Sequence, residues 1–246
     1  MKSHNLSMSQ PGQSYRLNGR LHHRRLELNG LRFEFAARIK RGNKAPRKFV
    51  ILGRPRSGST LLTRLLRQHS KIDCRDELLN RNLLRPFTFV EDLASSCNKD
   101  VFGFKVLIYQ IADIHRIPNL RRVMENFIAA DWRIIDLTRN TFDQTLSLCK
   151  AGQSGTYHII KDKRQTASQE DGKHNAAIDR ELFVHKYFWN ARFLQLEKSA
   201  LLGIPHLHID YDVELSDPNN HQDTLNRLFK LLNVPLERVT ADTSKV

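Results

Sequence analysis

The stretch Lys48-Phe-Val-Ile-Leu-Gly-Arg-Pro-Arg-Ser-Gly-Ser-Thr-Leu-Leu62 decides the fold. Its first five residues form an apolar run typical of a buried strand, and leucines then recur at helical spacing at positions 61, 62, 65 and 66. Between the two lies a glycine-containing loop, residues 53–60. A loop that leads from a strand into a helix presents backbone N–H groups and the positive end of the helix dipole to an anion. The stretch therefore predicts a strand, a phosphate-binding loop and a helix.

This loop departs from the Walker pattern G-x-x-x-x-G-K-[ST] at its central charge. Residues 53–60 read G-R-P-R-S-G-S-T, so Ser59 stands where the pattern has its lysine. Arg54 and Arg56 bring positive charge earlier in the loop, and a guanidinium group can bind phosphate or sulfuryl oxygens through two N–H groups. The loop is still predicted to bind an anion. Taken alone, it is also compatible with an ordinary turn that carries surface arginines.

The rest of the chain alternates between strand-like and helix-like patterns. Further strands are predicted at residues 102–109, 133–137 and 206–211, and helices at residues 119–130, 179–202 and 222–232. Residues 152–177 are polar and lack periodicity, which predicts a loop or lid. Alternating strands and helices predict an α/β, P-loop-like three-layer fold, in which helices flank a mainly parallel sheet.

The net charge of +14 over 246 residues is unevenly distributed. Residues 1–48 contain 12 Lys or Arg and two acidic residues, whereas the remainder has 28 basic and 24 acidic residues. We therefore divide the chain into a basic N-terminal extension, residues 1–45, and a single domain, residues 46–246. A nucleic-acid-binding protein would spread basic and aromatic residues across the domain, so this class is disfavoured.

The N-terminal extension lacks the features of a targeting segment. It has no apolar run long enough to span a bilayer and no unbroken apolar core of a signal peptide, so we expect a cytoplasmic protein. The extension either packs on the domain surface or rests as a basic amphipathic element on an anionic membrane or an acidic acceptor. The spacing of Cys74, Cys97 and Cys149 indicates reduced thiols and no zinc site. The sequence carries no signal for an oligomeric state.

A second motif, Ile134-Ile-Asp-Leu-Thr-Arg-Asn-Thr-Phe-Asp-Gln-Thr-Leu-Ser147, lies about 80 residues after the first. With the P-R-S-G-S-T-L-L core of the loop, it resembles the sulfotransferases that use 3'-phosphoadenosine 5'-phosphosulfate (PAPS). The loop core is typical of the carbohydrate branch, including bacterial enzymes of the nodulation-factor and lipopolysaccharide type. Weaker similarities, Gly103-Phe-Lys105 and Ile209–Leu215 among them, extend the resemblance over residues 48–234.

The resemblance implies a site for each phosphate of PAPS. Arg56 would contact the 5'-phosphate and the bridging oxygen, and Ser57, Gly58, Ser59 and Thr60 would supply backbone and hydroxyl donors, with Arg54 beside them. Arg139, at the end of a strand, and Ser147, eight residues later on the next helix, would hold the 3'-phosphate. The family chemistry needs no metal. One element is missing: we identify no C-terminal basic segment of the kind that often completes the nucleotide site.

The same resemblance suggests the catalytic groups. Arg56 would stabilise the leaving phosphate, and Lys105 would reach the sulfuryl oxygens. Small-molecule sulfotransferases carry a histidine two residues after this lysine, but here that residue is Leu107. The carbohydrate branch uses a glutamate after the first helix, and Glu77 stands in that place. Asp76 is adjacent and remains an alternative general base.

The sequence thus predicts an enzyme that moves a sulfuryl group from PAPS to a hydroxyl of a glycan or glycolipid-like acceptor. A kinase-like P-loop enzyme is the main alternative, and Asp136 would then be a candidate Mg²⁺ ligand. Ser59 in place of the lysine argues against that alternative. A non-enzymatic basic nucleic-acid-binding protein is the second alternative.

Overall fold

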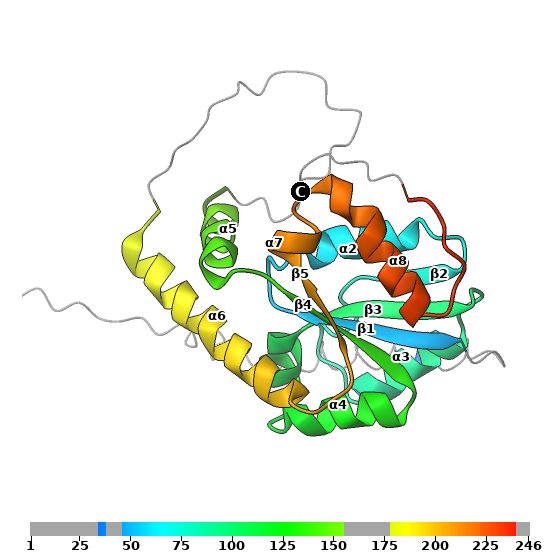
Figure 1. Cartoon of the computed structure of the whole chain (residues 1–246). Helices are drawn as coiled ribbons and strands as arrows, with labels where there is room; N and C mark the ends of the chain where they lie inside the picture. Colours follow the sequence, from blue (N-terminus) through cyan, green and yellow to red (C-terminus); the bar gives the residue numbers. More distant parts are fainter. Residues whose placement is uncertain (1–33, 38–45, 155–177, 240–246) are drawn as a thin grey trace, which may run out of the picture.

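The computed structural model describes residues 34–37, 46–154 and 178–239. Within this part of the chain, helices cover both faces of a five-stranded sheet of order β2-β3-β1-β4-β5 (Figure 1). The strands are β1 (Arg47–Gly53), β2 (Ile72–Arg75), β3 (Val101–Leu107), β4 (Trp132–Thr138) and β5 (Leu207–Asp210). All four neighbouring pairs are parallel. The predicted α/β fold with a parallel sheet is confirmed.

The central strand β1 divides its side chains between two apolar cores. Val50 and Leu52 face the core formed with α3 (Pro86–Ser95), α4 (Leu120–Ala129) and α6 (Arg180–Leu201). Phe49 and Ile51 face the core formed with α2 (Ser59–Arg67) and α8 (His221–Leu231); α2 and α8 lie above the sheet in Figure 1. Successive residues of a strand point to opposite faces, so a strand covered on both sides reads as an unbroken apolar run.

The remaining elements gather where the strands end. A π-helix, η1 (Gln110–Ile114), follows β3, α5 (Thr141–Ser154) follows β4, and α7 (Tyr211–Glu214) follows β5, with the short η2 (Pro218–Asn220) before α8. The carboxyl ends of parallel strands share one edge of the sheet, and open α/β sheets bind ligands there. The loops that carry both predicted phosphate motifs therefore meet at this edge.

The structure confirms the predicted strands and helices but differs from the sequence analysis in several places, among them the helix α3, which was not predicted. The strand β2 was not predicted, because it is only four residues long and two of them, Asp73 and Arg75, are charged. The strand β3 ends at Leu107 instead of residue 109, because η1 follows. Residues 152–154 form the last turn of α5 instead of the start of a loop. The rest of the predicted loop, residues 155–177, lies outside the described residues.

The longest described helix, α6, begins and ends as its sequence predicts. The Asp179 carboxylate caps its start by accepting hydrogen bonds from the backbone N of Glu181 and Leu182 at 2.8 and 3.4 Å. Gly203 follows its end with a φ of 73°, a left-handed conformation that suits glycine. Among the described helices, none is long and apolar enough to cross a membrane.

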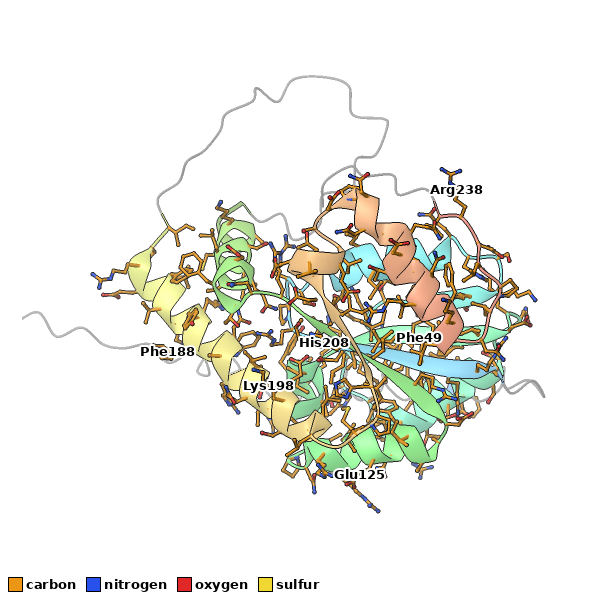
Figure 2. The ribbon with its side chains drawn as sticks, in the orientation of Figure 1. Phe49, Glu125, Phe188, Lys198, His208 and Arg238 are labelled. Carbon is orange, nitrogen blue, oxygen red and sulfur yellow. The ribbon has the colours of Figure 1, made fainter. Side chains whose placement is uncertain are left out.

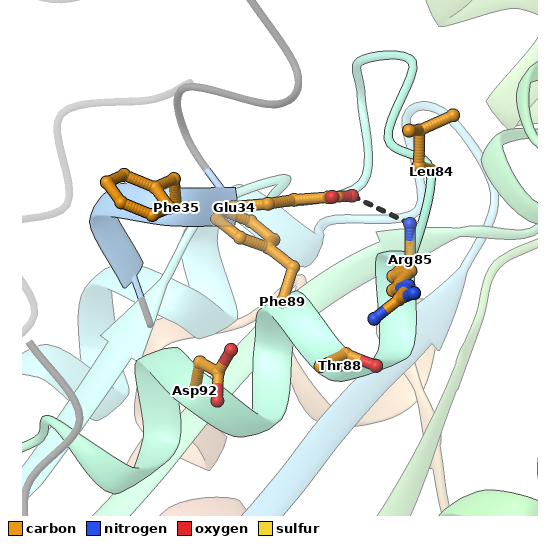
Figure 3. Close-up of a pocket in the computed structure, with 7 residues that line it drawn as sticks. All are labelled: Glu34, Phe35, Leu84, Arg85, Thr88, Phe89 and Asp92. Carbon is orange, nitrogen blue, oxygen red and sulfur yellow. Dashed lines mark hydrogen bonds between the residues drawn. The ribbon is translucent and has the colours of Figure 1, made fainter. Parts of the chain in front are cut away.

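A helical turn at residues 34–37 lies beside the start of α3 (Figure 3). The Glu34 carboxylate accepts a hydrogen bond from the Arg85 backbone N at 2.7 Å. An acid at a helix start satisfies a free N–H group and interacts favourably with the helix dipole. Phe35, Leu84 and Phe89 line an adjacent apolar cavity of about 240 Å³. Part of the predicted N-terminal extension therefore contacts the domain.

All three cysteines are buried free thiols. Burial raises the pKa of Cys74 to about 12, and burial is also the main cause of the raised pKa of Cys97 and Cys149. A thiol with a raised pKa is protonated at neutral pH and is a poor nucleophile. The cysteines therefore act as core residues.

Gly103 lies in the middle of β3, against Phe49 of β1. A Cβ atom added at position 103 would lie 2.2 Å from two carbons of the fully buried Phe49 ring. We predict that Gly103→Ala lowers the free energy of unfolding by about 1–3 kcal/mol, because an overpacked core must displace side chains or backbone. Urea unfolding followed by circular dichroism measures the loss.

The matched control for this substitution is Gly152→Ala. Gly152 is exposed in the last turn of α5. Alanine is favoured over glycine inside a helix by about 1 kcal/mol, so this variant should be at least as stable as the wild type. If both variants were as stable as the wild type, the close contact of Gly103 with Phe49 would not restrict the size of the residue at position 103.

Candidate active site

The predicted phosphate loop joins β1 to α2 at the centre of the sheet. Gly53 ends β1, and a Cβ atom there would lie 2.9 Å from Ser57 Oγ and 3.1 Å from the Leu137 carbonyl oxygen. Gly58 precedes α2 with a φ of 91°, which glycine adopts without strain. The first N–H groups of α2 have no acceptor within the helix. The glycines thus allow a tight turn that aims these groups at an anion.

The serine and threonine residues of the loop take up different positions. Ser57 is fully buried, and its hydroxyl has no hydrogen-bond partner among the described residues. Ser59 and Thr60 form the first turn of α2. The Thr60 hydroxyl accepts a hydrogen bond from Lys105. Buried polar groups normally have a partner, so the Ser57 hydroxyl keeps an unused capacity for a hydrogen bond.

Three residues from the two predicted phosphate motifs meet beside the loop. Arg56 Nε donates to Ser147 Oγ at 2.9 Å, and Arg139 Nη1 donates to the Arg56 carbonyl oxygen at 3.1 Å. Burial, followed by the charge of Arg139, lowers the pKa of Arg56. Two neighbouring guanidinium groups disfavour each other's charge, and an anion beside them removes this penalty. The structure therefore joins Arg56, Arg139 and Ser147 in one electropositive site.

The segment after β5 holds Arg139 in place. The guanidinium carbon of Arg139 lies 4.5 Å from the centroid of the Tyr211 ring, and its Nε lies 3.7 Å from Asp212 Oδ1. Asp212 Oδ2 also accepts a hydrogen bond from the Asn140 backbone N at 2.6 Å. The Tyr211 ring lies so close to Gly58 that an added Cβ would come within 2.2 Å of it. Tyr211 and Asp212 thus fix Arg139 relative to the loop.

Arg54 does not reach the anion-facing side of the loop. Its side chain is fully buried, and its Nε lies 3.2 Å from Glu197 Oε2 on α6. Its other two nitrogens donate to Thr141 Oγ1 and to the Arg139 carbonyl oxygen, both at 3.4 Å. Burial lowers the pKa of Arg54, although the charge of Glu197 acts in the opposite direction. The structure therefore places the Arg54 side chain among Glu197, Thr141 and Arg139.

Lys105 supplies a positive charge where the Walker lysine is absent. It is 2 % exposed on β3, and its Nζ donates to Thr60 Oγ1 at 2.9 Å. The same nitrogen lies 3.4 Å from Glu77 Oε1 and 3.6 Å from Asp76 Oδ1. Lys105 is therefore a buried cation between the start of α2 and two carboxylates.

Glu77 and Asp76 have different surroundings. Gln110 donates from Nε2 to Glu77 Oε2 at 2.6 Å, while its own Oε1 accepts from the Leu107 backbone N at 3.2 Å. Asp76 instead pairs with Arg67 at 2.5 Å, and its side chain is 55 % exposed. Burial alone would raise the pKa of Asp76, but Arg67 and then Lys105 outweigh it and lower the pKa. Glu77 is thus the better oriented of the two acids.

Asp136, the candidate Mg²⁺ ligand of a kinase-like enzyme, lies on β4 beside Glu197 and His208. Its Oδ2 is 2.9 Å from His208 Nδ1, and it interacts with Glu197 of α6. Within the described ranges, no group of three or more His, Cys, Asp or Glu side chains is placed to hold a metal ion. The contacts of Asp136 are therefore internal to the α6 side of the sheet.

Sequence reasoning missed three residues that support the site. Gln110 and Tyr211 lie in segments of weak similarity, each directly after a strand, but nothing in the sequence assigns their contacts. Glu197 carried a clearer signal, because it lies at helical spacing from the buried Phe193 and Leu201. An acid on the apolar face of a helix indicates a buried ion pair or hydrogen-bonded group.

The comparisons with known proteins agree with this geometry. The model of the sulfotransferase family matches residues 47–196, whereas no curated protein matches significantly. A sulfotransferase structure from Alicyclobacillus acidocaldarius is similar with a TM-score of 0.50 and 13 % identity, covering 82 % of this chain and 87 % of that one. Sulfotransferase STF9 from Mycobacterium avium gives 0.52 and 12 %, covering 87 % and 70 %.

A third similar structure is mouse sulfotransferase SULT7A1 in complex with PAP, with a TM-score of 0.51 and 11 % identity, covering 84 % of this chain and 65 % of that one. At these identities the structures show a shared fold. The family model extends over more than half of the chain and includes both phosphate motifs, Lys105 and Glu77. The chain therefore belongs to the sulfotransferase family.

Proposed function

We propose that the protein transfers a sulfuryl group from PAPS to a hydroxyl of a carbohydrate or glycolipid-like acceptor. The observation that carries this proposal is the meeting of Arg56, Arg139 and Ser147 beside the start of α2. PAPS carries phosphate groups at two positions of one nucleoside, and this site has donors from two separate motifs. A triphosphate site has no need of the second motif.

Each half of the site suits one phosphate. The N–H groups at the start of α2, with Ser57 and Arg56, would bind the 5'-phosphate. Arg139 and Ser147 would bind the 3'-phosphate, and Tyr211 and Asp212 would hold Arg139 in position. When bound, PAPS supplies the sulfuryl group.

The catalytic residues act on opposite sides of this group. Glu77 would accept the proton of the acceptor hydroxyl as its oxygen forms a bond to sulfur, while the bond from sulfur to the phosphate oxygen breaks. Arg56 would stabilise the charge that develops on the leaving phosphate, and Lys105 would stabilise the sulfuryl oxygens. Gln110 orients Glu77 by its hydrogen bond to Oε2. PAP and the sulfated acceptor are the products.

The proposed acceptor class, a carbohydrate, has its own support. It follows from the resemblance of the loop and from a carboxylate base in place of a histidine at position 107. A cluster of aromatic rings also lies on α5 and α6: the ring centroids of Phe142 and Phe183 are 5.1 Å apart, and the Tyr187 ring contacts those of Phe183 and Phe188. Phe188 is exposed and is labelled in Figure 2. Flat aromatic faces suit the apolar faces of sugar rings.

A binding titration tests the donor. We expect PAP to bind more tightly than ATP with Mg²⁺ by at least tenfold, because ATP has no 3'-phosphate for Arg139 and Ser147, and a lost charge-assisted hydrogen bond costs about 1.5–3 kcal/mol. Calorimetric titration with PAP, ATP and a DNA duplex at physiological salt compares the affinities expected of a sulfotransferase, a kinase-like enzyme and a nucleic-acid-binding protein. Tighter binding of ATP would favour a kinase-like enzyme, and strong salt-dependent DNA binding by residues 46–246 would favour a nucleic-acid-binding protein.

The N-terminal extension should be dispensable for donor binding, because both phosphate motifs follow it. Deleting residues 1–44 should leave the Kd for PAP unchanged within about twofold, and should lower stability by about 1 kcal/mol through loss of the bond from Glu34 to α3. Deleting residues 1–33 keeps this bond and should preserve both quantities. Loss of PAP affinity in a folded 45–246 chain would contradict the prediction.

A further inference from the structure

The buried Arg54 connects three segments of the site that are distant in sequence. Its backbone belongs to the phosphate loop, and its guanidinium group donates to the Arg139 carbonyl oxygen and to the hydroxyl of Thr141, the first residue of α5. Its Nε faces Glu197 of α6 at 3.2 Å. One side chain therefore ties the loop for one phosphate to the segment that carries the groups for the other.

The partners of Arg54 belong to a polar cluster that extends from the core to the exposed His208 of β5. Glu197 is 1 % exposed, and burial, followed by the charge of Asp136, raises its pKa well above its usual range, while Arg54 acts in the opposite direction. Asp136 in turn lies 2.9 Å from His208 on β5. The cluster therefore links the phosphate loop to β4, β5 and α6.

Stability alone does not explain such a cluster. A buried ion pair is weakly stabilising, because the cost of desolvation offsets the attraction, and apolar residues of similar size often serve as well. A guanidinium group that donates to a backbone carbonyl and a hydroxyl, however, fixes the relative positions of both segments in a way that an apolar contact does not. The structure supplies a reason for such fixation, because Arg56 and Arg139 lie on the two segments that Arg54 joins.

We propose that Arg54 and Glu197 form a spacing pair that sets the distance between the two phosphate sites, and so selects a nucleotide with both a 3'- and a 5'-phosphate. This inference rests on the proposed function. Arg54 and Glu197 are positioning residues, since both side chains are buried and act through the segment of Arg139. Glu197 holds the guanidinium group, and the guanidinium group holds the Arg139 segment against the loop. A ligand with two phosphates needs this spacing, whereas a ligand with only a 5'-phosphate does not.

The test is a comparison of PAP with AMP, which lacks the 3'-phosphate. In Arg54→Met the affinity for PAP should fall by roughly ten- to hundredfold, because two hydrogen bonds that fix the spacing are lost, while the affinity for AMP should change by less than about threefold. The double variant Arg54→Met/Glu197→Met removes the unpaired buried carboxylate and should show the same change in the ratio of the two affinities. Both are measured by calorimetric titration.

Arg47→Met is the matched control. Arg47 lies at the opposite end of β1, where its guanidinium group also donates to a backbone carbonyl, that of Leu232, at 3.0 Å. Its loss should lower stability without changing the ratio of the affinities for PAP and AMP. If Arg54→Met does not fold, Glu197→Gln replaces it, because the amide keeps the size of the side chain and removes the carboxyl group that faces Arg54.

The outcomes separate this inference from the proposed function. A wild-type protein that binds PAP no better than AMP would contradict the two-phosphate site itself. A wild-type preference for PAP that survives in the folded Arg54 or Glu197 variants would overturn the spacing pair and leave the proposed function intact. A reduced preference in those variants, but not in Arg47→Met, supports the pair.

Discussion

Replacing Glu77 with Gln should lower the rate of sulfuryl transfer by about a hundred- to ten-thousandfold, the usual contribution of a general base. The amide keeps the size of the side chain and can still accept the hydrogen bond from Gln110, but it cannot take a proton. The affinity for PAP should remain, because the contacts of Glu77 are with Gln110 and Lys105 and not with Arg56, Arg139 or Ser147. Single-turnover kinetics measure the rate at which the sulfuryl group moves from PAPS to the acceptor. Calorimetric titration measures the affinity for PAP.

The control for this prediction is Asp76→Asn. Asp76 is half-exposed, pairs with Arg67 and has a lowered pKa, which makes it a weaker base. Its replacement should cost less than about tenfold in rate, since the exposed pair with Arg67 contributes little. Equal small losses in the two variants would contradict the assignment of Glu77, and a larger loss in Asp76→Asn would transfer the role of base to Asp76.

Replacing Arg56 with Met should lower the rate of transfer by about a hundred- to thousandfold, the effect of removing one preorganised donor to developing charge. Arg56 is placed for this role by Ser147 and by its neighbour Arg139. Because the leaving phosphate gains charge as the bond to sulfur breaks, the loss should fall more on kcat than on the affinity for PAP. Steady-state kinetics with varied PAPS separate the two.

Arg64→Met is the matched control for Arg56. Arg64 lies in the last turn of α2, away from the phosphate loop, and its replacement removes the same charge from the protein. Its kinetics should stay within about twofold of the wild type, because a half-buried charge at the far end of α2 acts only weakly on the site through salt solution. Similar losses in both variants would indicate a general effect of net charge.

The sequence predicted the fold because its apolar runs are long and clearly bounded. The run at residues 48–52 lies on the central strand, whose two faces are both covered, so burial leaves no polar residue to interrupt the pattern. The strand β2 lacked this signal, because a four-residue strand near the edge of the sheet buries only Ile72 and Cys74. Periodicity thus identifies central elements better than short peripheral ones.

The sequence placed the phosphate motifs but not the direction of each side chain. Arg54 and Arg56 are two residues apart in the loop, and sequence alone gave both a role in binding the nucleotide. The structure separates them: Arg54 continues the α6-facing side of β1 into the core, whereas Arg56, with a φ of 65°, turns towards Ser147. The partners of Glu77 and Arg139 were also unpredictable, because Gln110 and Tyr211 reach them from η1 and α7, which are distant in sequence.

The most direct test of the two-phosphate site is a crystal structure of the protein with PAP. We predict that the 5'-phosphate lies on the backbone N–H groups at the start of α2, and that the 3'-phosphate contacts Arg139 and Ser147. These contacts would replace part of the present bonding between Arg56 and Ser147. A nucleotide bound with its 3'-phosphate distant from both Arg139 and Ser147 would contradict the account.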